Sequence, residues 1–234
     1  MNNLSIVLCT YNEEKFINKT LQNLLDKEIV KEIIIVDDNS TDETINIIKK
    51  IGNKKIKLFV RKNIRGFASA LNFGISKTNE NYILRFDVDM YSEINYFIDK
   101  FKQYPEKDCI IFSRYIKDGK DLRGIYRKYP SFIINKICSI LLSNKIKDYT
   151  SCIMIFKKNI LEEMPIKNTV YANFIIEFIF LLINKKKSFI EIPFVQKRNT
   201  EDNSKSAPNL IIFIKNGTLY LLTIMKCLVM KFFS

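Results

Sequence analysis

Two carboxylates one residue apart, Asp87 and Asp89, directly follow an apolar, β-prone run at residues 83–86. At the end of a strand both side chains could reach one hard divalent cation, because Mg²⁺ and Mn²⁺ prefer carboxylate oxygens. A cation held there would neutralise a nucleoside diphosphate as it leaves a substrate. Because an Asp-x-Asp pair also occurs in many solvated loops, its meaning depends on the polar residues elsewhere in the chain.

Strand and helix patterns alternate through the first half of the sequence. Continuous apolar runs predict buried strands, and amphipathic spacing between them predicts helices. The strands are expected at residues 4–9, 32–36, 56–60 and 82–86, and the helices at 13–25, 42–51 and 66–76. This alternation predicts an α/β fold with a doubly wound, mostly parallel central sheet flanked by helices.

Three polar clusters follow strands of this predicted sheet, at residues 10–13, 37–38 and 87–89. In doubly wound sheets, ligands bind beyond the carboxyl ends of the strands. The clusters should therefore share one edge, and we predict a nucleotide site there.

The second half has a less regular pattern and no internal repeat or linker. Strands are expected at residues 109–112, 151–156 and 189–194, helices at 130–142 and 173–183, and polar loops at 117–124 and 196–208. We predict one domain over residues 1–208, followed by an amphipathic helix over residues 209–234.

Composition limits the possible chemistry. The 234 residues include 38 basic and 25 acidic side chains but no histidine, which excludes a histidine base, a Ser-His-Asp triad and histidine-ligated metals. The five cysteines form no C-x-x-C motif, which argues against a disulfide framework and a zinc site and suits a reducing cytosol. The net charge of +13 suggests an anionic partner. No basic-aromatic stacking motif supports nucleic acid as that partner.

Together the motifs resemble glycosyltransferase family 2 on a GT-A fold. The superfamily pattern lies at residues 5–14, 35–42 and 87–89. Downstream segments resemble the dolichyl-phosphate (polyprenyl-phosphate) mannosyltransferases and glucosyltransferases. These segments are residues 113–115, Arg127 with Ser131, residues 148–151 and residues 191–193. The likeness covers residues 4–208.

The resemblance implies a nucleotide-sugar donor, GDP-mannose or UDP-glucose, and a polyprenyl phosphate acceptor. Mg²⁺ or Mn²⁺ is expected on Asp87 and Asp89. The expected donor-binding residues are Thr10, Tyr11, Asn12, Glu13, Asp37, Asp38, Arg65, Asp87, Arg198 and Lys205. The expected acceptor-binding residues are Arg114, Arg127, Ser131, Ser151 and Glu177. The residues expected to be catalytic are Asp87, Asp89, Arg114 and Arg127.

Two positions depart from the family pattern. Tyr91 stands where this branch often has glutamine, and a phenol is a poor neutral ligand for Mg²⁺. Cys152 stands where a glycine is usual after Thr-Ser.

The acceptor class follows from the need for a base. A hydroxyl acceptor needs one to remove its proton, and without histidine only a carboxylate such as Glu177 or Asp148 could serve. A phosphate monoester is already ionised near neutral pH and needs only cations such as Arg114 and Arg127 to bind it. The sequence therefore favours a phosphate acceptor. Two alternatives remain open: transfer to a sugar hydroxyl in polysaccharide or glycolipid synthesis, and a non-catalytic nucleotide or nucleic-acid binder.

Two segments suggest contact with a membrane, the helix at 130–142 and the C-terminal helix. Basic residues outnumber acidic ones over residues 185–234, and the uncharged run 216–225 is far shorter than the roughly 20 residues that a spanning helix needs. Such helices are expected to lie on the cytoplasmic face of a bilayer as a peripheral anchor. The alternative is that both pack on the domain.

Overall fold

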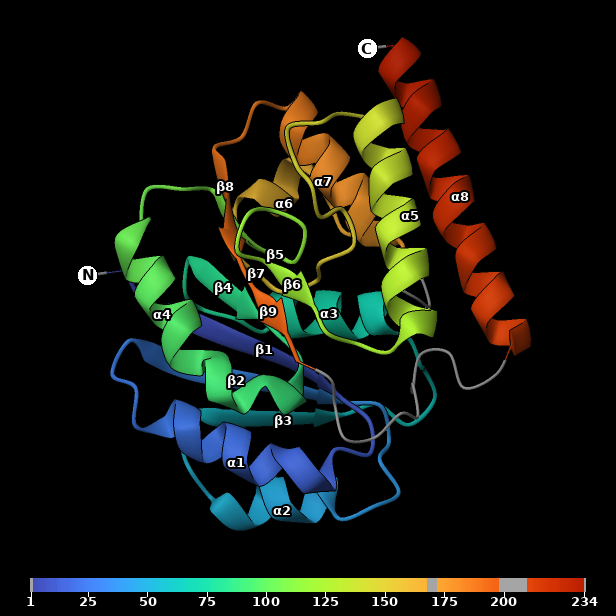
Figure 1. Cartoon of the computed structure of the whole chain (residues 1–234). Helices are drawn as coiled ribbons and strands as arrows, with labels where there is room; N and C mark the ends of the chain where they lie inside the picture. Colours follow the sequence, from blue (N-terminus) through green and yellow to red (C-terminus); the bar gives the residue numbers. More distant parts are fainter. Residues whose placement is uncertain (1, 168–171, 198–209, 234) are drawn as a thin grey trace.

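The computed structural model describes residues 2–167, 172–197 and 210–233, with the backbone alone for residues 210–214. The predicted alternation in the first half is confirmed (Figure 1). Its elements are β1 (Leu4–Thr10), α1 (Glu14–Leu25), β2 (Val30–Asp37), α2 (Thr44–Ile51), β3 (Ile56–Val60), α3 (Phe67–Ser76) and β4 (Tyr82–Arg85).

The second half continues with shorter strands and longer helices. A 3₁₀ helix, η1 (Val88–Glu93), follows β4. The remaining elements are α4 (Ile94–Gln103), β5 (Cys109–Ser113), β6 (Lys120–Asp121), α5 (Ile125–Leu141), β7 (Met154–Lys157), α6 (Ile160–Glu163), α7 (Phe174–Asn184), β8 (Phe189–Pro193), β9 (Val195–Gln196) and α8 (Leu210–Phe232).

In the described part of the chain, seven strands form one sheet in the order β3-β2-β1-β4-β7-β5-β8. Only β7 runs antiparallel to its neighbours, β4 and β5. The strands β6 and β9 pair separately in parallel. Because β2, β1 and β4 are adjacent and parallel, their carboxyl ends lie at one edge of the sheet.

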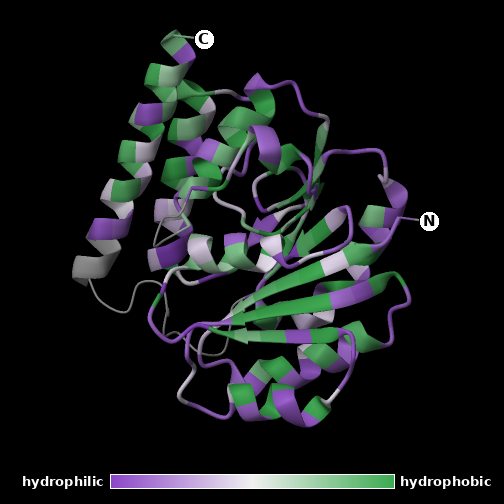
Figure 2. Ribbon diagram, turned by 180° about the vertical axis from the view of Figure 1, so that it is seen from behind, coloured by the Kyte–Doolittle hydropathy of each residue, from purple (hydrophilic) through white to green (hydrophobic). Residues whose placement is uncertain are grey.

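Both faces of the sheet are covered, as the apolar strands predict. The side chains of Ile33 and Ile35 pack into a core with α1, α2 and α4, whereas those of Ile34 and Val36 pack into a second core with α3, α5 and α7. All four residues are fully buried. Figure 2 shows the central strands as mostly hydrophobic, with short hydrophilic bands, between helices that carry both hydrophobic and hydrophilic residues.

Three predicted bounds in the second half are wrong. The helix expected at residues 130–142 begins at Ile125 and contains Pro130, because the carbonyl of Gly124 accepts hydrogen bonds from the amides of Arg127 and Lys128 at 2.9 and 3.0 Å. The strand expected at 151–156 begins at Met154. The loop expected at 117–124 contains β6, which forms through its long-range pairing with β9.

The C-terminal helix α8 lies along α5 and α7 (Figure 1). Ile224 and Cys227 are buried against the domain, and Thr223 Oγ1 accepts a hydrogen bond from Asn173 Nδ2 at 3.0 Å. Lys231 Nζ donates to the carbonyls of Leu141 and Leu142 at the end of α5. Among the described residues, no helix combines the length and the apolarity needed to cross a membrane. The predicted boundary between residues 208 and 209 lies outside the described residues.

Candidate active site

The loops after β1, β2 and β4 converge at one edge of the sheet. Thr10 lies opposite Asp37 in the β1–β2 pairing, and Val7 lies opposite Arg85 in the β1–β4 pairing. Strands two positions apart in a sheet are separated by roughly 10 Å. Burial raises the pKa of the Cys9 thiol to about 12, and the charges of Arg85, Asp38, Arg61 and Asp87 all perturb it. The clusters after β2 and β4 therefore follow the two strands that flank β1.

Asp37 holds the first two of these loops together. Its carboxylate is fully buried and accepts hydrogen bonds from Thr10 Oγ1 at 2.6 Å and from the amide and hydroxyl of Ser40 at 2.7 and 2.6 Å. The amide of Asn12, which has a left-handed φ of 54°, donates to Ser40 Oγ at 2.9 Å. Asp37 and Thr10 are therefore buried beneath the predicted donor site, where they position its loops. Any effect that they have on a ligand would be indirect.

Asn12 and Glu13 continue the same loop toward α2. Asn12 Oδ1 accepts the amide of Thr41 at 2.9 Å, and the amide of Glu13 donates to Thr44 Oγ1 at 2.7 Å. Both predicted residues thus lie at the rim of the edge, where their backbones are fixed by the neighbouring loop.

Asp38 directly follows β2 at this edge of the sheet and is paired with Arg61. Its carboxylate accepts Arg61 Nε at 2.7 Å and the amide of Gly66 at 3.1 Å. Arg61 also donates to the carbonyl of Gly66 at 3.1 Å, so the pair fixes the turn before α3. Sequence reasoning missed Arg61, because nothing along the chain indicates that this residue at the end of β3 faces Asp38.

Tyr11 and Arg65 bring an aromatic ring and a cation together at the same edge. The guanidinium carbon of Arg65 lies 4.0 Å from the centroid of the Tyr11 ring. Arg65 is exposed and Tyr11 is half-buried. Such a pair offers a stacking surface and a positive charge for a nucleotide.

The carboxylates of Asp87 and Asp89 stand at the start of η1. The Asp87 side chain is 49% exposed, and its Oδ1 accepts a hydrogen bond from Arg85 Nη2. Asp89 is half-buried in the first turn of η1, whose Val88 carbonyl accepts Thr20 Oγ1 at 2.5 Å. Among the described residues, no group of three or more acidic or cysteine side chains could hold a metal alone. Two carboxylates fit a Mg²⁺-like ion that takes its other ligands from substrate phosphates and water.

Arg114 organises the predicted acceptor side. The buried guanidinium forms a bidentate pair with Asp148, at 2.8 Å from Nε and 2.7 Å from Nη2. Nη2 also donates to Thr150 Oγ1 at 2.7 Å, and Nη1 to Gln196 at 3.2 Å. The charge of Arg114 outweighs burial and lowers the pKa of Asp148. Arg114 thus positions this cluster through protein acceptors, and its predicted contact with an acceptor phosphate stays a prediction.

Hydroxyl groups join the N-terminal half of α5 to the same cluster. Thr150 Oγ1 lies 3.0 Å from Ser131 Oγ and accepts Asn135 Nδ2 at 2.8 Å. Arg127 is half-buried one turn before Ser131 on α5. Ser151 Oγ, by contrast, donates to the carbonyl of Phe112 at 2.6 Å and is buried. The structure therefore brings Ser131 to this cluster and turns Ser151 toward the sheet, and Arg127 lies on the same face of α5 as Ser131.

Glu177 is paired with two lysines, and its predicted role in binding the acceptor stays a prediction. On α7, its carboxylate forms ion pairs with Lys167 at 2.8 Å and with Lys226 of α8 at 2.6 Å. Burial alone would raise the pKa of Glu177, but the two lysines lower it. Its observed role is to join α7 to α8. The predicted donor residues Arg198 and Lys205 lie outside the described residues.

Sequence reasoning also missed Arg85, Asp121 and Arg123. Asp121 accepts both Arg123 Nε at 2.9 Å and Arg123 Nη2 at 2.6 Å, and it lies 3.6 Å from Arg114. The only signal in the sequence was the position of Asp121 and Arg123 in a polar loop. Arg85 was hidden within an apolar strand pattern, although a charge two residues before Asp-x-Asp is itself unusual for a buried strand.

The comparisons with known proteins agree on one family. The profile of Glycosyl transferase family 2 matches residues 5–165. The poly-beta-1,6-N-acetyl-D-glucosamine synthase of Staphylococcus aureus (strain COL) is 30% identical over 166 residues, which are 68% of this chain and 40% of that protein. A Methanococcus voltae dolichyl N-acetyl-alpha-D-glucosaminyl phosphate 3-beta-D-2,3-diacetamido-2,3-dideoxy-beta-D-glucuronosyltransferase is 32% identical over 144 residues, 58% of this chain and 40% of that protein. The chain thus spans about 40% of the length of these curated relatives.

Solved structures establish the fold. Glucosyl-3-phosphoglycerate synthase of Mycobacterium tuberculosis, in complex with Mn²⁺, UDP and glucosyl-3-phosphoglycerate, superposes with a TM-score of 0.72 at 14% identity. The match covers 97% of this chain and 80% of that chain. The same enzyme with Mg²⁺ and UDP gives a TM-score of 0.70. The predicted GT-A fold is confirmed.

The Asp121 carboxylate should make stability depend on pH. Burial would raise its pKa, but the hydrogen bonds and charge of Arg123, with Arg114, lower it from 3.8 to about 2. A lowered folded-state pKa stabilises the fold by about 2 kcal/mol above pH ~4, and this contribution disappears as the pH falls toward 2. We expect the difference in unfolding free energy between wild type and Asp121→Asn, from urea titrations, to shrink by about 1 kcal/mol between pH 6 and pH 3. A difference that stays constant would contradict the assignment.

Proposed function

The chain belongs to glycosyl transferase family 2, and we propose that it transfers a hexose from a nucleotide diphosphate sugar to a polyprenyl phosphate, with inversion at the anomeric carbon. The observation that carries this proposal is the state of the carboxylates in the acceptor cluster and on the neighbouring helix α7. Asp121, Asp148 and Glu177 are each paired with arginine or lysine. Glu191 accepts the amides of residues 147 and 148. The first three are thus held in ion pairs. Burial raises the pKa of Glu191, but both of its oxygens are occupied by the two amides. A phosphate acceptor requires no base.

The start of α7 supports the same acceptor class. Family members that act on a hydroxyl often carry a pair of acids on the corresponding helix, whereas α7 has one acid, Glu177. Asn173 stands at the helix start, and its side chain donates to Thr223 of α8. An amide cannot accept a proton at neutral pH, so this position stabilises the contact with α8 and leaves the acceptor to arrive already ionised.

The donor would bind at the edge formed by the loops after β1, β2 and β4. Tyr11 and Arg65 provide the stacking surface and charge, and Asp38 faces the same opening. Asp87 and Asp89 are the residues that would hold Mg²⁺ or Mn²⁺. Such an ion, when bound, neutralises charge that develops on the departing diphosphate. The M. tuberculosis neighbours, which were solved with UDP and Mn²⁺ or Mg²⁺, support a nucleotide donor and a divalent cation.

The acceptor phosphate would meet the cluster on the N-terminal half of α5. Arg127 supplies positive charge and Ser131 a hydroxyl one helical turn later. Arg114 holds Thr150, and through it Ser131, in place. Rigid placement of donor and acceptor lets the phosphate oxygen approach the anomeric carbon from the side opposite the diphosphate.

A lipid acceptor also requires a membrane surface, and α5 and α8 provide one side suited to it. Neither helix contains an acidic residue, and together they carry six basic ones: Arg127, Lys128, Lys136, Lys215, Lys226 and Lys231. Large apolar side chains on them are exposed: Ile125, Tyr126, Tyr129, Phe132, Ile133, Ile140, Leu141, Leu221, Leu222, Met225, Val229 and Phe232. Exposed apolar residues among cations are what an anionic bilayer surface attracts. We place this side against the cytoplasmic leaflet.

The curated relatives favour a second candidate, transfer to a sugar hydroxyl. One is named as a synthase of poly-beta-1,6-N-acetyl-D-glucosamine, and the other for transfer to a dolichyl-linked sugar phosphate. This candidate requires a carboxylate base, and Glu177 is the acid of α7 that could fill that role after release from its lysines. A non-catalytic nucleotide or nucleic-acid binder is the third candidate, which the retained Asp-x-Asp pair disfavours.

Transfer is tested directly with radiolabelled UDP-glucose or GDP-mannose, Mn²⁺ and a polyprenyl phosphate. We expect label in a chloroform-soluble product, and none with the dephosphorylated polyprenol or with EDTA. Asp89→Asn should lower the rate at least about 100-fold, because it removes a ligand of the cation. Glu177→Gln should remain within about tenfold of wild type.

Two outcomes would reject the phosphate acceptor. One is transfer to a saccharide but to no lipid phosphate. The other is loss of transfer in a folded Glu177→Gln variant, which would identify a carboxylate base.

Membrane contact is tested by flotation with liposomes. The wild type should float with vesicles that contain anionic phosphatidylglycerol and much less with neutral phosphatidylcholine vesicles. Met225→Glu with Val229→Glu places two charges on the exposed side of α8 and should lower binding at least about tenfold. Lys50→Glu on α2, on the opposite side of the sheet, is the control for a general change of charge. Equal flotation of the two variants would contradict the assigned surface.

A further inference from the structure

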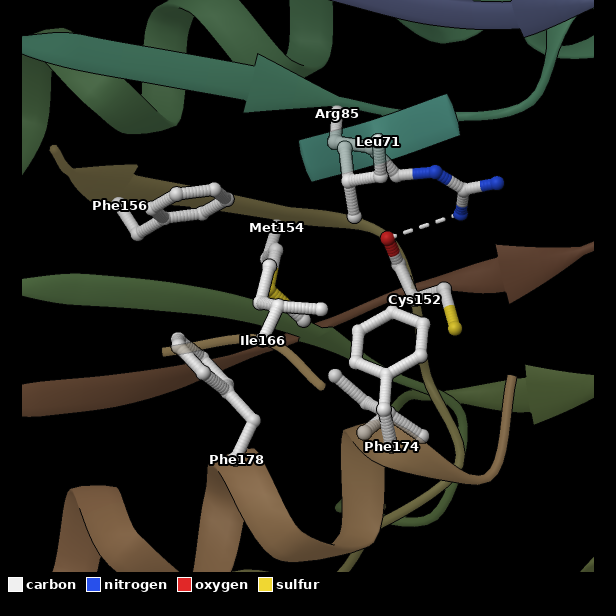
Figure 3. Close-up of a pocket in the computed structure, with 9 residues that line it drawn as sticks. Leu71, Arg85, Cys152, Met154, Phe156, Ile166, Phe174 and Phe178 are labelled. Carbon is white, nitrogen blue, oxygen red and sulfur yellow. Dashed lines mark hydrogen bonds between the residues drawn. The ribbon is translucent and has the colours of Figure 1, made fainter. Parts of the chain in front are cut away.

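Arg85 is a buried cation beside the Asp-x-Asp pair. It ends β4 and is only 6% exposed. Its guanidinium carbon lies 4.3 Å from the centroid of the Phe67 ring, and its side chain lines a small, mostly apolar hollow with Cys152 and Phe174 (Figure 3). A cation in such surroundings needs a counter-charge and hydrogen-bond acceptors.

Asp87 supplies that counter-charge. Arg85 Nη2 donates to Asp87 Oδ1, and Nη1 donates to the carbonyl of Cys152 at 2.9 Å, the bond drawn in Figure 3. Among the described residues, Arg85 Nε has no partner. The Asp87 side chain nevertheless stays 49% exposed. One carboxylate therefore compensates a buried arginine and also faces the donor site.

The pairing of Arg85 with Asp87 lowers the net negative charge available to a divalent cation at Asp87 and Asp89. Asp87 and Asp89 carry two negative charges, but the guanidinium of Arg85 cancels one of them. Repulsion between a divalent cation and a guanidinium held on the same carboxylate weakens binding by more than tenfold at the effective dielectric of a protein surface. A nucleoside diphosphate would restore the missing negative charge when it binds.

We propose that Arg85 is a positioning residue that makes cation binding at Asp87 and Asp89 depend on the diphosphate of the donor. This inference rests on the proposed function only for the class of donor. Arg85 fixes the orientation of Asp87, and its charge keeps the cation from binding tightly before the donor arrives. Cation and donor therefore enter the site together.

If the role of Arg85 were purely structural, replacing it would weaken metal binding instead of strengthening it. Removing a hydrogen-bond partner of a metal-binding carboxylate typically weakens metal binding or activity by 10- to 100-fold, about the cost of a lost orientation. Removing a competing charge strengthens metal binding. The two accounts can therefore be separated by metal affinity alone, without any sugar transfer.

The test measures Mn²⁺ binding to the full chain by electron paramagnetic resonance, with no sugar donor or acceptor present. Arg85→Gln removes the charge and should bind Mn²⁺ at least about tenfold more tightly than wild type. Arg85→Lys keeps the charge and should stay within about threefold of wild type. Equal or weaker binding by Arg85→Gln would overturn the proposal, as would a gain of the same size in Arg85→Lys.

Circular dichroism checks that each variant is folded, and Arg85→Met replaces Arg85→Gln if the latter is not. The wild type gives a further test that needs no substitution. Saturating UDP or GDP should tighten its Mn²⁺ binding at least about tenfold, after correction for Mn²⁺ bound to nucleotide in solution. Binding that is equally tight without nucleotide would overturn the proposal. A protein that transfers no sugar can still pass every one of these tests, so the two proposals fail separately.

Discussion

Carboxylates at the carboxyl edge of the sheet must be compensated within the protein, and this requirement determines the geometry of the site. Burying a carboxylate without partners costs far more than a fold of this size can offset. Asp37 is compensated by Thr10 and Ser40, and Asp38 by Arg61. Elsewhere in the site Arg114 compensates the buried Asp148, and the partly exposed Asp87 compensates the buried Arg85. The pairs of Thr10 with Asp37, Arg61 with Asp38 and Arg114 with Asp148 also join segments that are distant in the sequence, so the interaction that compensates the charge also places the loop.

The pairs divide into a donor side and an acceptor side. Around β1, β2 and β4, charges and an aromatic ring lie along one edge of the sheet, where the proposed function places the diphosphate and the cation. Around α5 and β5, the pairing of Arg114 with Asp148 positions hydroxyl groups instead of presenting a reactive carboxylate. The two helices that border the acceptor side, α5 and α8, carry the exposed apolar residues and no acids. Site chemistry and surface composition thus support the same kind of acceptor, a charged group on a lipid.

The sequence predicted the sheet well, because a parallel sheet buried on both faces leaves a continuous apolar pattern. Residues 56–60 match β3 at both ends, and the helix over residues 66–76 differs from α3 by one residue. Local pattern was insufficient where an element forms through a distant partner. The strand β6 exists because β9 pairs with it, and α5 extends past Pro130 because Gly124 begins its first turn.

The site residues also divide into those that the local sequence pattern reveals and those that depend on a partner seen only in the structure. The Asp-x-Asp pair and the loop after β1 could be identified from spacing alone. The partner Arg61 could not, because only the structure shows that it faces Asp38 at the end of the neighbouring strand. Arg85 lies two residues before its partner Asp87, but the apolar strand pattern does not show that they pair. Glu177 was predicted to bind the acceptor, and in the structure its carboxylate forms an ion pair with Lys226 of α8. A single sequence does not show which lysine approaches a buried acid from 49 residues away.

The central claim is that the acids after β2 and after β4 act on one ligand. Calorimetric titration of UDP and GDP, with and without Mn²⁺, tests this most directly when it is applied to Asp38→Asn and Asp89→Asn. We expect Mn²⁺-dependent nucleotide binding by the wild type, and a loss of at least about tenfold in both variants, although the two residues follow different strands. Unchanged binding in one folded variant, or nucleotide binding that ignores Mn²⁺ in the wild type, would contradict a shared site.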